Sequence, residues 1–241
     1  MRNYQREFEN RVAFIRELLQ KSGAKGIIFG NSGGKDSALV GILCRAACEN
    51  TLGVMLPCSI KRNYEEDMVD GLEVARQFDI QTRIVNLTAV KEAEIEELSK
   101  VTTLNNAAVV NIAPRLRMTT LYAIAAAEGR LVAGTDNKSE IYVGYYTKWG
   151  DGAHDFNPIA DLTVTEVYEF LEYLGAPKAI LTKAPSAALS DGQTDESEMG
   201  VSYAELDAYI RGEEIAPEKA ARIEQMHRVS EHKRKGITTF Q

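Results

Sequence analysis

The fold of this chain follows from residues 27–37, which read Ile27-Ile28-Phe29-Gly30-Asn31-Ser32-Gly33-Gly34-Lys35-Asp36-Ser37. The apolar residues 27–29 predict a buried strand, and the glycine-rich residues 30–34 predict a turn into a helix that begins near Asp36. Glycines let a backbone approach a phosphate closely, and the free N–H groups of a first helical turn point at it. Ser32 and Ser37 add hydroxyl groups, and Asp36 fits beside a phosphate if a divalent cation lies between them. The stretch therefore predicts an anion-binding site.

The turn differs from two common phosphate-binding motifs. A Walker A loop needs Gly-Lys followed by Ser or Thr, whereas here Gly34-Lys35 is followed by Asp36. The glycine spacing does not match the G-x-G-x-x-G dinucleotide motif either. Ser-Gly-Gly-x-Asp-Ser after a strand resembles the PP-loop of the ATP pyrophosphatases, which holds the pyrophosphate end of ATP. An ordinary glycine-rich turn between a strand and a helix is the alternative that this stretch alone leaves open.

Strands and helices alternate along the chain. Apolar runs predict strands at residues 27–29, 52–56, 81–87 and 130–133. Helical periods predict helices at residues 4–21, 37–49, 65–78, 90–98, 105–128 (interrupted at Pro114), 163–174, 202–211 and 217–233. This order is typical of an α/β fold, a doubly wound, mostly parallel sheet with helices on both faces. We expect one domain spanning residues 1–241.

Two segments that follow strands are expected to share one crevice. Ligands in such folds bind outside the carboxyl ends of the strands, and residues 30–37 and 134–140 both lie just beyond a predicted strand. Residues 183–200 are rich in Ser, Asp, Gly and Thr, which predicts a mobile loop. We expect this loop to fold over bound substrate.

The composition limits the possible partners and location. The chain has 241 residues, is 44% hydrophobic and carries a net charge of −7, which argues against broad nucleic-acid binding. No run approaches the ~18 apolar residues of a membrane span, and the N-terminus has no signal-peptide core. The three cysteines, Cys44, Cys48 and Cys58, do not pair off. Cys44 and Cys48 lie one helical turn apart but lack a second pair for a metal site, so we interpret these two as small buried hydrophobes. We expect a cytoplasmic protein with small-molecule partners, without nucleic acid or membrane.

Five blocks in order make the resemblance specific. They are Asn-Ile-Ala-Pro-Arg-Leu-Arg-Met at 111–118, Gly-Thr-Asp-Asn-Lys-Ser-Glu at 134–140, Gly-Tyr-Tyr-Thr-Lys-Trp-Gly-Asp-Gly at 144–152, Gln-Thr-Asp-Glu at 193–196 and Glu-His-Lys-Arg at 231–234. With the PP-loop, these blocks resemble the NAD synthetase family. The resemblance implies an adenine nucleotide alpha-hydrolase-like fold. It also implies ATP-dependent amidation of deamido-NAD to NAD with ammonia, through an acyl-adenylate, releasing AMP and pyrophosphate.

The resemblance implies an ATP site with a metal. Residues Gly30, Asn31, Ser32, Gly33, Gly34, Lys35, Asp36 and Ser37 would hold ATP, together with Thr135 and Ser186. Asp36 and Glu140 would be the catalytic carboxylates that hold Mg²⁺. A helix-surface acid is the alternative interpretation of Glu140, and a helix N-cap is the alternative for Thr135.

A second group of residues is implied to bind deamido-NAD. Its members are Arg115, Lys148, Asp155, His232 and Lys233. By composition alone, the basic run near the C-terminus would be a solvated helix end, where cations are favoured. The neighbouring Arg117 could instead make a structural ion pair.

The sequence departs from the family pattern at two positions. Val164 stands where many members have a lysine that contacts an ATP phosphate, so one positive charge is missing. Lys35 stands at the variable PP-loop position, where many relatives have an uncharged residue. We hypothesise that Lys35 restores part of the lost charge near the phosphates; a lysine that points into solvent is the alternative.

The nitrogen donor and the assembly follow from the same resemblance. No segment resembles a glutaminase, so ammonia is the expected donor, and a separate glutaminase subunit stays open. Another PP-loop ligase and a catalytically degenerate nucleotide-binding protein are the competing interpretations. Family members are homodimers whose long central helices pack together, which makes residues 105–128 the candidate interface. The apolar positions of that helix would serve equally well in the core of a monomer.

Overall fold

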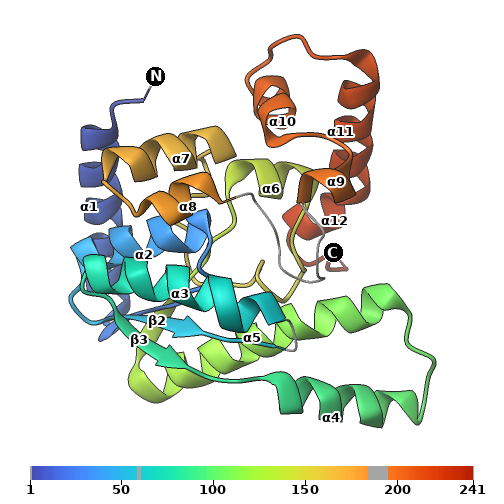
Figure 1. Ribbon diagram of the computed structural model, residues 1–241, viewed down its shortest axis with the longest axis horizontal. Coiled ribbons are helices and arrows are strands. Elements are labelled where there is room, and N and C mark those ends of the chain that lie inside the picture. The colour runs from blue at the N-terminus through green and yellow to red at the C-terminus, as the bar shows by residue number, and fades with distance from the viewer. Residues whose placement is uncertain (1, 59–60, 184–194, 241) are drawn as a thin grey trace.

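The computed structural model describes residues 2–58, 61–183 and 195–240. A four-stranded sheet in the order β3-β2-β1-β4 lies among helices, and every strand pairing in it is parallel (Figure 1). The strands are β1 (Gly26–Gly30), β2 (Thr51–Met55), β3 (Gln81–Ile84) and β4 (Arg130–Ala133). The predicted parallel α/β fold is confirmed, although β3 ends at Ile84 rather than at residue 87.

Helices cover the sheet and extend beyond it. They are α1 (Tyr4–Ser22), α2 (Lys35–Ala47), α3 (Lys61–Gln77), α4 (Thr88–Ser99), α5 (Asn106–Glu128), α6 (Lys138–Val143), α7 (Val164–Tyr173), α8 (Lys178–Thr182), α9 (Asp195–Met199), α10 (Tyr203–Ile210), α11 (Pro217–Val229) and α12 (Glu231–Arg234). The predicted helix at 217–233 is divided at Ser230 into α11 and α12. The sequence did not predict α6, α8 and α9, because helices of five or six residues are too short to show a helical period.

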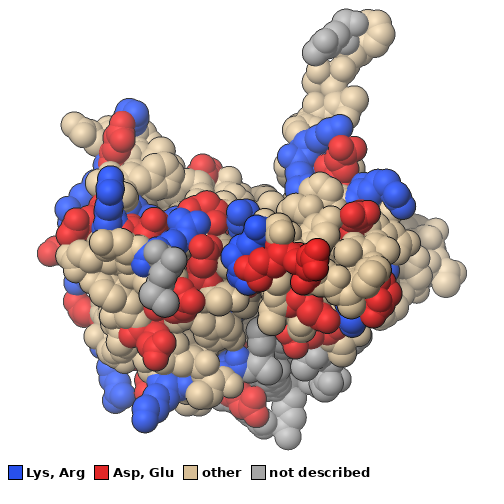
Figure 2. Space-filling model, turned by 90° about the horizontal axis from the view of Figure 1, so that it is seen from above, with Lys and Arg blue, Asp and Glu red and all other residues tan. Residues whose placement is uncertain are grey.

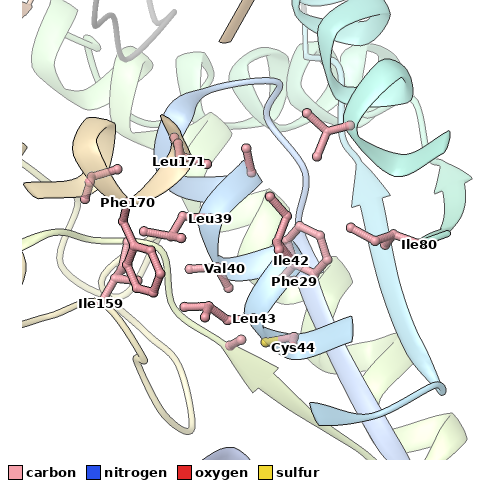
Figure 3. Packing of buried hydrophobic residues seen from close by; sticks show 14 of the residues in the cluster. Phe29, Leu39, Val40, Ile42, Leu43, Cys44, Ile80, Ile159, Phe170 and Leu171 are labelled. Atoms are coloured by element: carbon pink, nitrogen blue, oxygen red, sulfur yellow. The ribbon is translucent and has the colours of Figure 1, made fainter. Parts of the chain in front are cut away.

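Apolar side chains fill both faces of the sheet. Successive residues of a strand point to opposite faces. Ile27 and Phe29 of β1 pack into a first cluster with α1, α2 and α7, where Figure 3 shows Phe29 beside Ile42 of α2. Ile28 packs into a second cluster with β2 and with α5 on the opposite face. Helices therefore cover both faces, as the sequence predicted.

A third apolar cluster holds the C-terminal helices to the rest of the molecule. It contains Val143 of α6, Val164 of α7, Tyr203 and Leu206 of α10, and Ile223 of α11. In Figure 1 these helices lie to one side of the sheet, next to α6. Packing of this cluster fixes α6, which carries one of the predicted catalytic carboxylates.

A proline lies inside α5 without ending the helix, so the predicted interruption is wrong. Proline lacks the N–H that would donate to the carbonyl four residues earlier, and its ring crowds that carbonyl. Pro114 is buried, and the flanking Ala113, Met118 and Leu121 pack into the second cluster. Packing on both sides of the proline keeps α5 continuous.

The surface carries charges of both signs. Figure 2 shows acidic and basic side chains interspersed over one face of the molecule. Such mixing is typical of solvated surface charge. Among the helices of the described residues, none combines the length and the apolar character needed to cross a membrane.

Candidate active site

A cavity of about 260 Å³ opens at the carboxyl ends of β1, β2 and β4. Its walls come from the glycine-rich loop after β1, from residues 55–57 after β2, from residues 133–136 after β4, and from one side of α5. The two segments that were expected to share a crevice, 30–37 and 134–140, both contribute to it. Parallel strands end at the same edge of a sheet, and this topology explains why loops distant in sequence meet here.

The loop after β1 has a fixed shape. Gly33 has a φ of +70°, and a Cβ atom there would lie 2.0 Å from the carbonyl oxygen of Asp67 in α3, so only glycine fits. The buried Asn31 side chain donates to the carbonyl oxygen of Gly71 in α3 at 3.0 Å and accepts from the Gly33 N–H. The loop is therefore held against α3.

The first turn of α2 opens into the cavity. Its N-cap is Gly34, which has no side chain to satisfy the N–H groups of the turn. The hydroxyl groups of Ser32 and Ser37 lie 3.1 Å apart beside it. Backbone N–H groups and hydroxyls at a helix N-terminus suit a phosphate group.

Lys35 is buried in the wall of the cavity. Its side-chain nitrogen lies 2.7 Å from Asp36 Oδ2 and 3.6 Å from Glu140 Oε1. The residue is only 7% exposed, so the alternative that it points into solvent is wrong. Burial works against the charged ammonium, but the charges of Asp36 and Glu140 outweigh burial and raise the pKa of Lys35.

Asn137 joins the two predicted metal carboxylates. Its side-chain oxygen accepts from the Glu140 N–H, its own N–H donates to Glu140 Oε2 at 3.2 Å, and its Nδ2 donates to Asp36 Oδ1 at 3.0 Å. Burial first, and then the charge of Asp36, raise the pKa of Glu140 to about 8. Glu140 therefore faces the cavity, and its alternative interpretation as a helix-surface acid is wrong.

Thr135 lies in the cavity wall between β4 and α6. The N-cap of α6 is Asn137 rather than Thr135, so the N-cap alternative for Thr135 is wrong. Ser186, the remaining residue of the predicted ATP site, lies outside the described residues, as does most of the predicted loop at 183–200.

Sequence reasoning missed several charged residues of the cavity wall. Asp136 and Asp151 lie within two of the quoted blocks, which was the signal that could have identified them. Burial raises the pKa of Asp136 well above its usual range, and the charge of Asp151 adds to this effect. Arg117 also lines the cavity, and its Nε donates to the carbonyl oxygen of Leu56 at 3.0 Å.

Lys183, Asp195 and Asp67 are further charged wall residues that the sequence analysis missed. The Lys183 ammonium lies 2.8 Å from Asp67 and 2.5 Å from Asp70, and it donates to the carbonyl oxygen of Gly33 at 3.2 Å. Lys183 therefore connects α3 to the glycine-rich loop after β1. The isolated lysine gave no sequence pattern by which to find it.

The five residues predicted to hold the dinucleotide lie outside the cavity wall, as far as the described residues define it. Arg115 donates to the carbonyl oxygen of Lys148, and Lys148 donates to the carbonyl oxygen of His232 at 2.5 Å, so these three lie together. The Lys233 ammonium donates to the carbonyl oxygen of Gly144 at 2.6 Å.

Asp155 stands apart from these four. One of its carboxylate oxygens accepts from the Val132 N–H at 2.8 Å, and the other accepts from the Tyr122 hydroxyl at 3.1 Å. The side chain thus satisfies a backbone N–H of β4. No pattern in the sequence indicated that Asp155 would make these structural contacts.

The three cysteines have free thiols. Cys44 is fully buried in the first cluster, and burial raises the pKa of its thiol. Cys48 is only partly buried, at the edge of the same cluster, so the interpretation as a small buried hydrophobe holds for Cys44 and in part for Cys48. Cys58 is buried in the second cluster. Within 2–58, 61–183 and 195–240, no group of three or more His, Cys, Asp or Glu side chains could hold a metal ion. A metal at Asp36 and Glu140 would take its other ligands from substrate or water.

Comparisons with known proteins identify the family of the chain. The NAD synthase family matches residues 7–236. The chain is 43% identical to an NH(3)-dependent NAD(+) synthetase from Carboxydothermus hydrogenoformans over 97% of this chain and 96% of that protein. It is 41% identical to one from Archaeoglobus fulgidus over 96% and 95% of the two chains.

Two solved structures have the same fold. The NMN synthetase of Francisella tularensis superposes with a TM-score of 0.93 and 37% identity, covering 99% of both chains. The NH3-dependent NAD synthetase of Campylobacter jejuni superposes with a TM-score of 0.83 and 28% identity, covering 100% of both. NAD synthases use ATP as cosubstrate. The chain therefore belongs to the NAD synthase family and is an enzyme of its ammonia-dependent type.

Proposed function

We propose that the enzyme converts deamido-NAD to NAD with ATP and ammonia. The nicotinate carboxylate attacks the α-phosphorus of ATP, which forms an acyl-adenylate and releases pyrophosphate. Ammonia then attacks the acyl carbon, AMP leaves, and the amide remains. The observation that carries the proposal is one cavity that combines an uncapped helix N-terminus with the carboxylate pair Asp36 and Glu140.

The cavity wall suits this reaction because two anions must approach each other. The N–H groups at the start of α2 and the hydroxyls of Ser32 and Ser37 would bind the pyrophosphate end of ATP. Arg117 adds positive charge to the same wall, whereas the charge of Lys183 is balanced by Asp67 and Asp70. Such fixed donors stabilise charge that develops during transfer, and positioning supplies much of the remaining acceleration.

Asp36 and Glu140 are the residues that would hold Mg²⁺. The fit rests on their placement: Asn137 holds the two largely buried carboxylates together, with its Nδ2 on Asp36 Oδ1 and its backbone N–H on Glu140 Oε2. Burial first, and then the charge of Asp36, raise the pKa of Glu140 to about 8, and a bound cation would offset the repulsion between the two charges. When bound, Mg²⁺ would neutralise charge on the phosphates of ATP.

We further propose that Arg115, Lys148, Asp155, His232 and Lys233 bind deamido-NAD. The mutual contacts of Arg115, Lys148 and His232 support a basic surface made by these three residues, and the proposal for Asp155 and Lys233 rests on the family resemblance. A second candidate substrate is the corresponding nicotinate mononucleotide. It is favoured by the TM-score of 0.93 with the NMN synthetase of Francisella tularensis.

We also propose a cytoplasmic homodimer. The three free thiols suit a reducing compartment. Three apolar residues of α5 are already buried within one chain and cannot face a partner: Ile112, Leu121 and Ala125. Support for a dimer therefore comes from the half-buried Leu116 and Ile124 of the same helix and from the family resemblance.

An assay of the purified protein tests the proposed reaction. We expect NAD from deamido-NAD, ATP, Mg²⁺ and ammonium, with AMP and pyrophosphate formed in equal amounts to NAD. Ammonia-free glutamine in place of ammonium should give no NAD. A parallel reaction with nicotinate mononucleotide compares kcat/KM for the two acceptors, and a higher value for the mononucleotide would favour the second candidate. Binding of ATP without either product would point to another PP-loop ligase or to a degenerate nucleotide-binding protein.

A further inference from the structure

The ammonium group of Lys35 lies between Asp36 and Glu140, the two carboxylates that are predicted to hold the metal. Lys35 Nζ lies 2.7 Å from Asp36 Oδ2 and 3.6 Å from Glu140 Oε1. It also lies 5.4 Å from the centre of the Tyr203 ring, whose face attracts a cation. The ammonium is thus held by two carboxylates and an aromatic face, in the wall of the cavity.

The remaining carboxylate oxygens are already engaged by Asn137. Asp36 Oδ1 accepts from its side chain and Glu140 Oε2 accepts from its backbone N–H. The oxygens that these bonds leave available are Asp36 Oδ2 and Glu140 Oε1, and both face Lys35. A metal that uses these oxygens would lie about 2.1 Å from each, since Mg²⁺ requires short oxygen bonds. The ammonium stands in that space.

No other basic side chain among the described residues lies within ion-pair distance of these two carboxylates. Val164, at the start of α7, packs into the third apolar cluster and brings no charge to them. Two cations a few ångströms apart in a partly buried site repel strongly. Lys35 and a divalent cation therefore exclude each other from the pair in this arrangement.

The geometry points to Lys35 as a resident counter-ion that competes with the divalent cation for Asp36 and Glu140. The inference rests on the assignment of Asp36 and Glu140 as metal ligands in the proposed function. Metal binding requires the ammonium to move, and the space open to it is the cavity, where the phosphates of ATP would give it a new partner. Metal and nucleotide then bind cooperatively, because the phosphate removes the competitor.

Binding of Mn²⁺ to the protein without nucleotide tests this competition. Lys35→Met keeps the aliphatic stem and removes the ammonium. We expect Mn²⁺ to bind this variant about tenfold more tightly than the parent enzyme, as measured by electron paramagnetic resonance of free Mn²⁺. The matched control is Lys100→Met, which removes the same charge from the exposed pair with Glu97 and should leave the affinity unchanged.

A second substitution locates the metal. In the double variant Lys35→Met and Glu140→Gln, the gain in Mn²⁺ affinity should disappear. Thermal unfolding with and without Mn²⁺ reports whether each variant folds, because a ligand that binds the native state raises the Tm. The Tm of Lys35→Met should rise with Mn²⁺ more than that of the parent.

Three outcomes would overturn the inference. They are equal Mn²⁺ affinity in the parent and Lys35→Met, weaker binding in Lys35→Met, and a gain that survives Glu140→Gln. None of them requires product formation, so failure of this inference is distinguishable from failure of the proposed reaction, which the NAD assay measures separately.

Discussion

Asn137 links two functional side chains that lie about 100 residues apart in the chain. Because its side chain is fully buried and makes hydrogen bonds to both α6 and Asp36, it sets the separation of Asp36 and Glu140. It acts on substrate only through those carboxylates, and we regard it as a positioning residue.

Substitution of Asn137 should therefore affect both stability and catalysis. Asn137→Ala removes an N-cap, and we expect the free energy of unfolding to fall by about 1 kcal/mol. We also expect the KM for ATP to rise and kcat to fall, because Asp36 loses the hydrogen bond that ties it to α6 and keeps only the one from Lys35. Urea unfolding and steady-state kinetics measure the two effects.

The matched control for this substitution is Asn105→Ala. Asn105 caps α5 in the same way, accepting from the Ala108 N–H at 2.9 Å, but it is exposed and away from the cavity wall. It should lose comparable stability with unchanged kinetics. Equal kinetic losses in the two variants would contradict the positioning role of Asn137.

For single residues, the sequence predicted which side chains line the cavity better than it predicted the contacts that those side chains make. Asp36, Glu140 and Thr135 all line the cavity, as the motifs indicated. The burial of Lys35 and the contacts of Asp155 could not be predicted, because they depend on Glu140 and Val132, which lie far away in the chain.

Among the helices, α1 is joined to the loop before α7 by partly exposed ion pairs. Arg11 of α1 makes two hydrogen bonds to the Asp161 carboxylate, at 2.7 and 2.9 Å, and Arg2 adds a third at 3.1 Å. Burial disfavours the charge on Asp161, but the bonds and charge of Arg11, with the charge of Arg2, outweigh it and hold the pKa below its usual range. The pairs stabilise the fold only while Asp161 is ionised.

The stabilisation from Asp161 should therefore vanish in acid. A depressed pKa means that the unfolded chain binds the proton more readily, so stability is lost as pH falls below about 5. Asp161→Asn should lower the free energy of unfolding by about 1 kcal/mol at neutral pH, a modest value because the side chain is half exposed. The difference from the parent should shrink towards about pH 2.

Urea unfolding across this pH range checks the prediction. Glu17→Gln is the control, since Glu17 pairs with Lys21 on the exposed side of the same helix and should change stability little at any pH. A difference between Asp161→Asn and the parent that is constant with pH would contradict the ion-pair explanation.

The elements themselves were largely predictable. The four strands and the long helices follow from apolar runs and helical periods, because those patterns record which side is buried. The interruption at Pro114 was wrong because local propensity was weighed without the packing of Ala113, Met118 and Leu121 around it. The five-residue helices could not be predicted, since tertiary packing rather than sequence period sustains them.

For the whole molecule, the assembly state is the property that the sequence left most open. We expect sedimentation velocity at micromolar concentration to show a dimer. Leu116→Glu, at a half-buried position of α5, should shift the species towards monomer if that helix forms the interface. Val229→Glu is a control at an apolar side chain that is 65% exposed on α11. A monomer for the parent protein would contradict the proposal.

The order of the strands in the sheet means that β1 is synthesised well before one of its two neighbours. The partner on one side of β1 is β2, which follows it closely, whereas the partner on the other side is β4, with Gly26 paired to Arg130 about 100 residues later. At translation rates of about 5–20 residues per second, the β4 edge of β1 waits roughly 5–20 s for its neighbour. During that interval the apolar segment Ile27–Phe29 has a free backbone edge on the ribosome. Protection of the nascent chain by a chaperone should therefore matter most before β4 emerges.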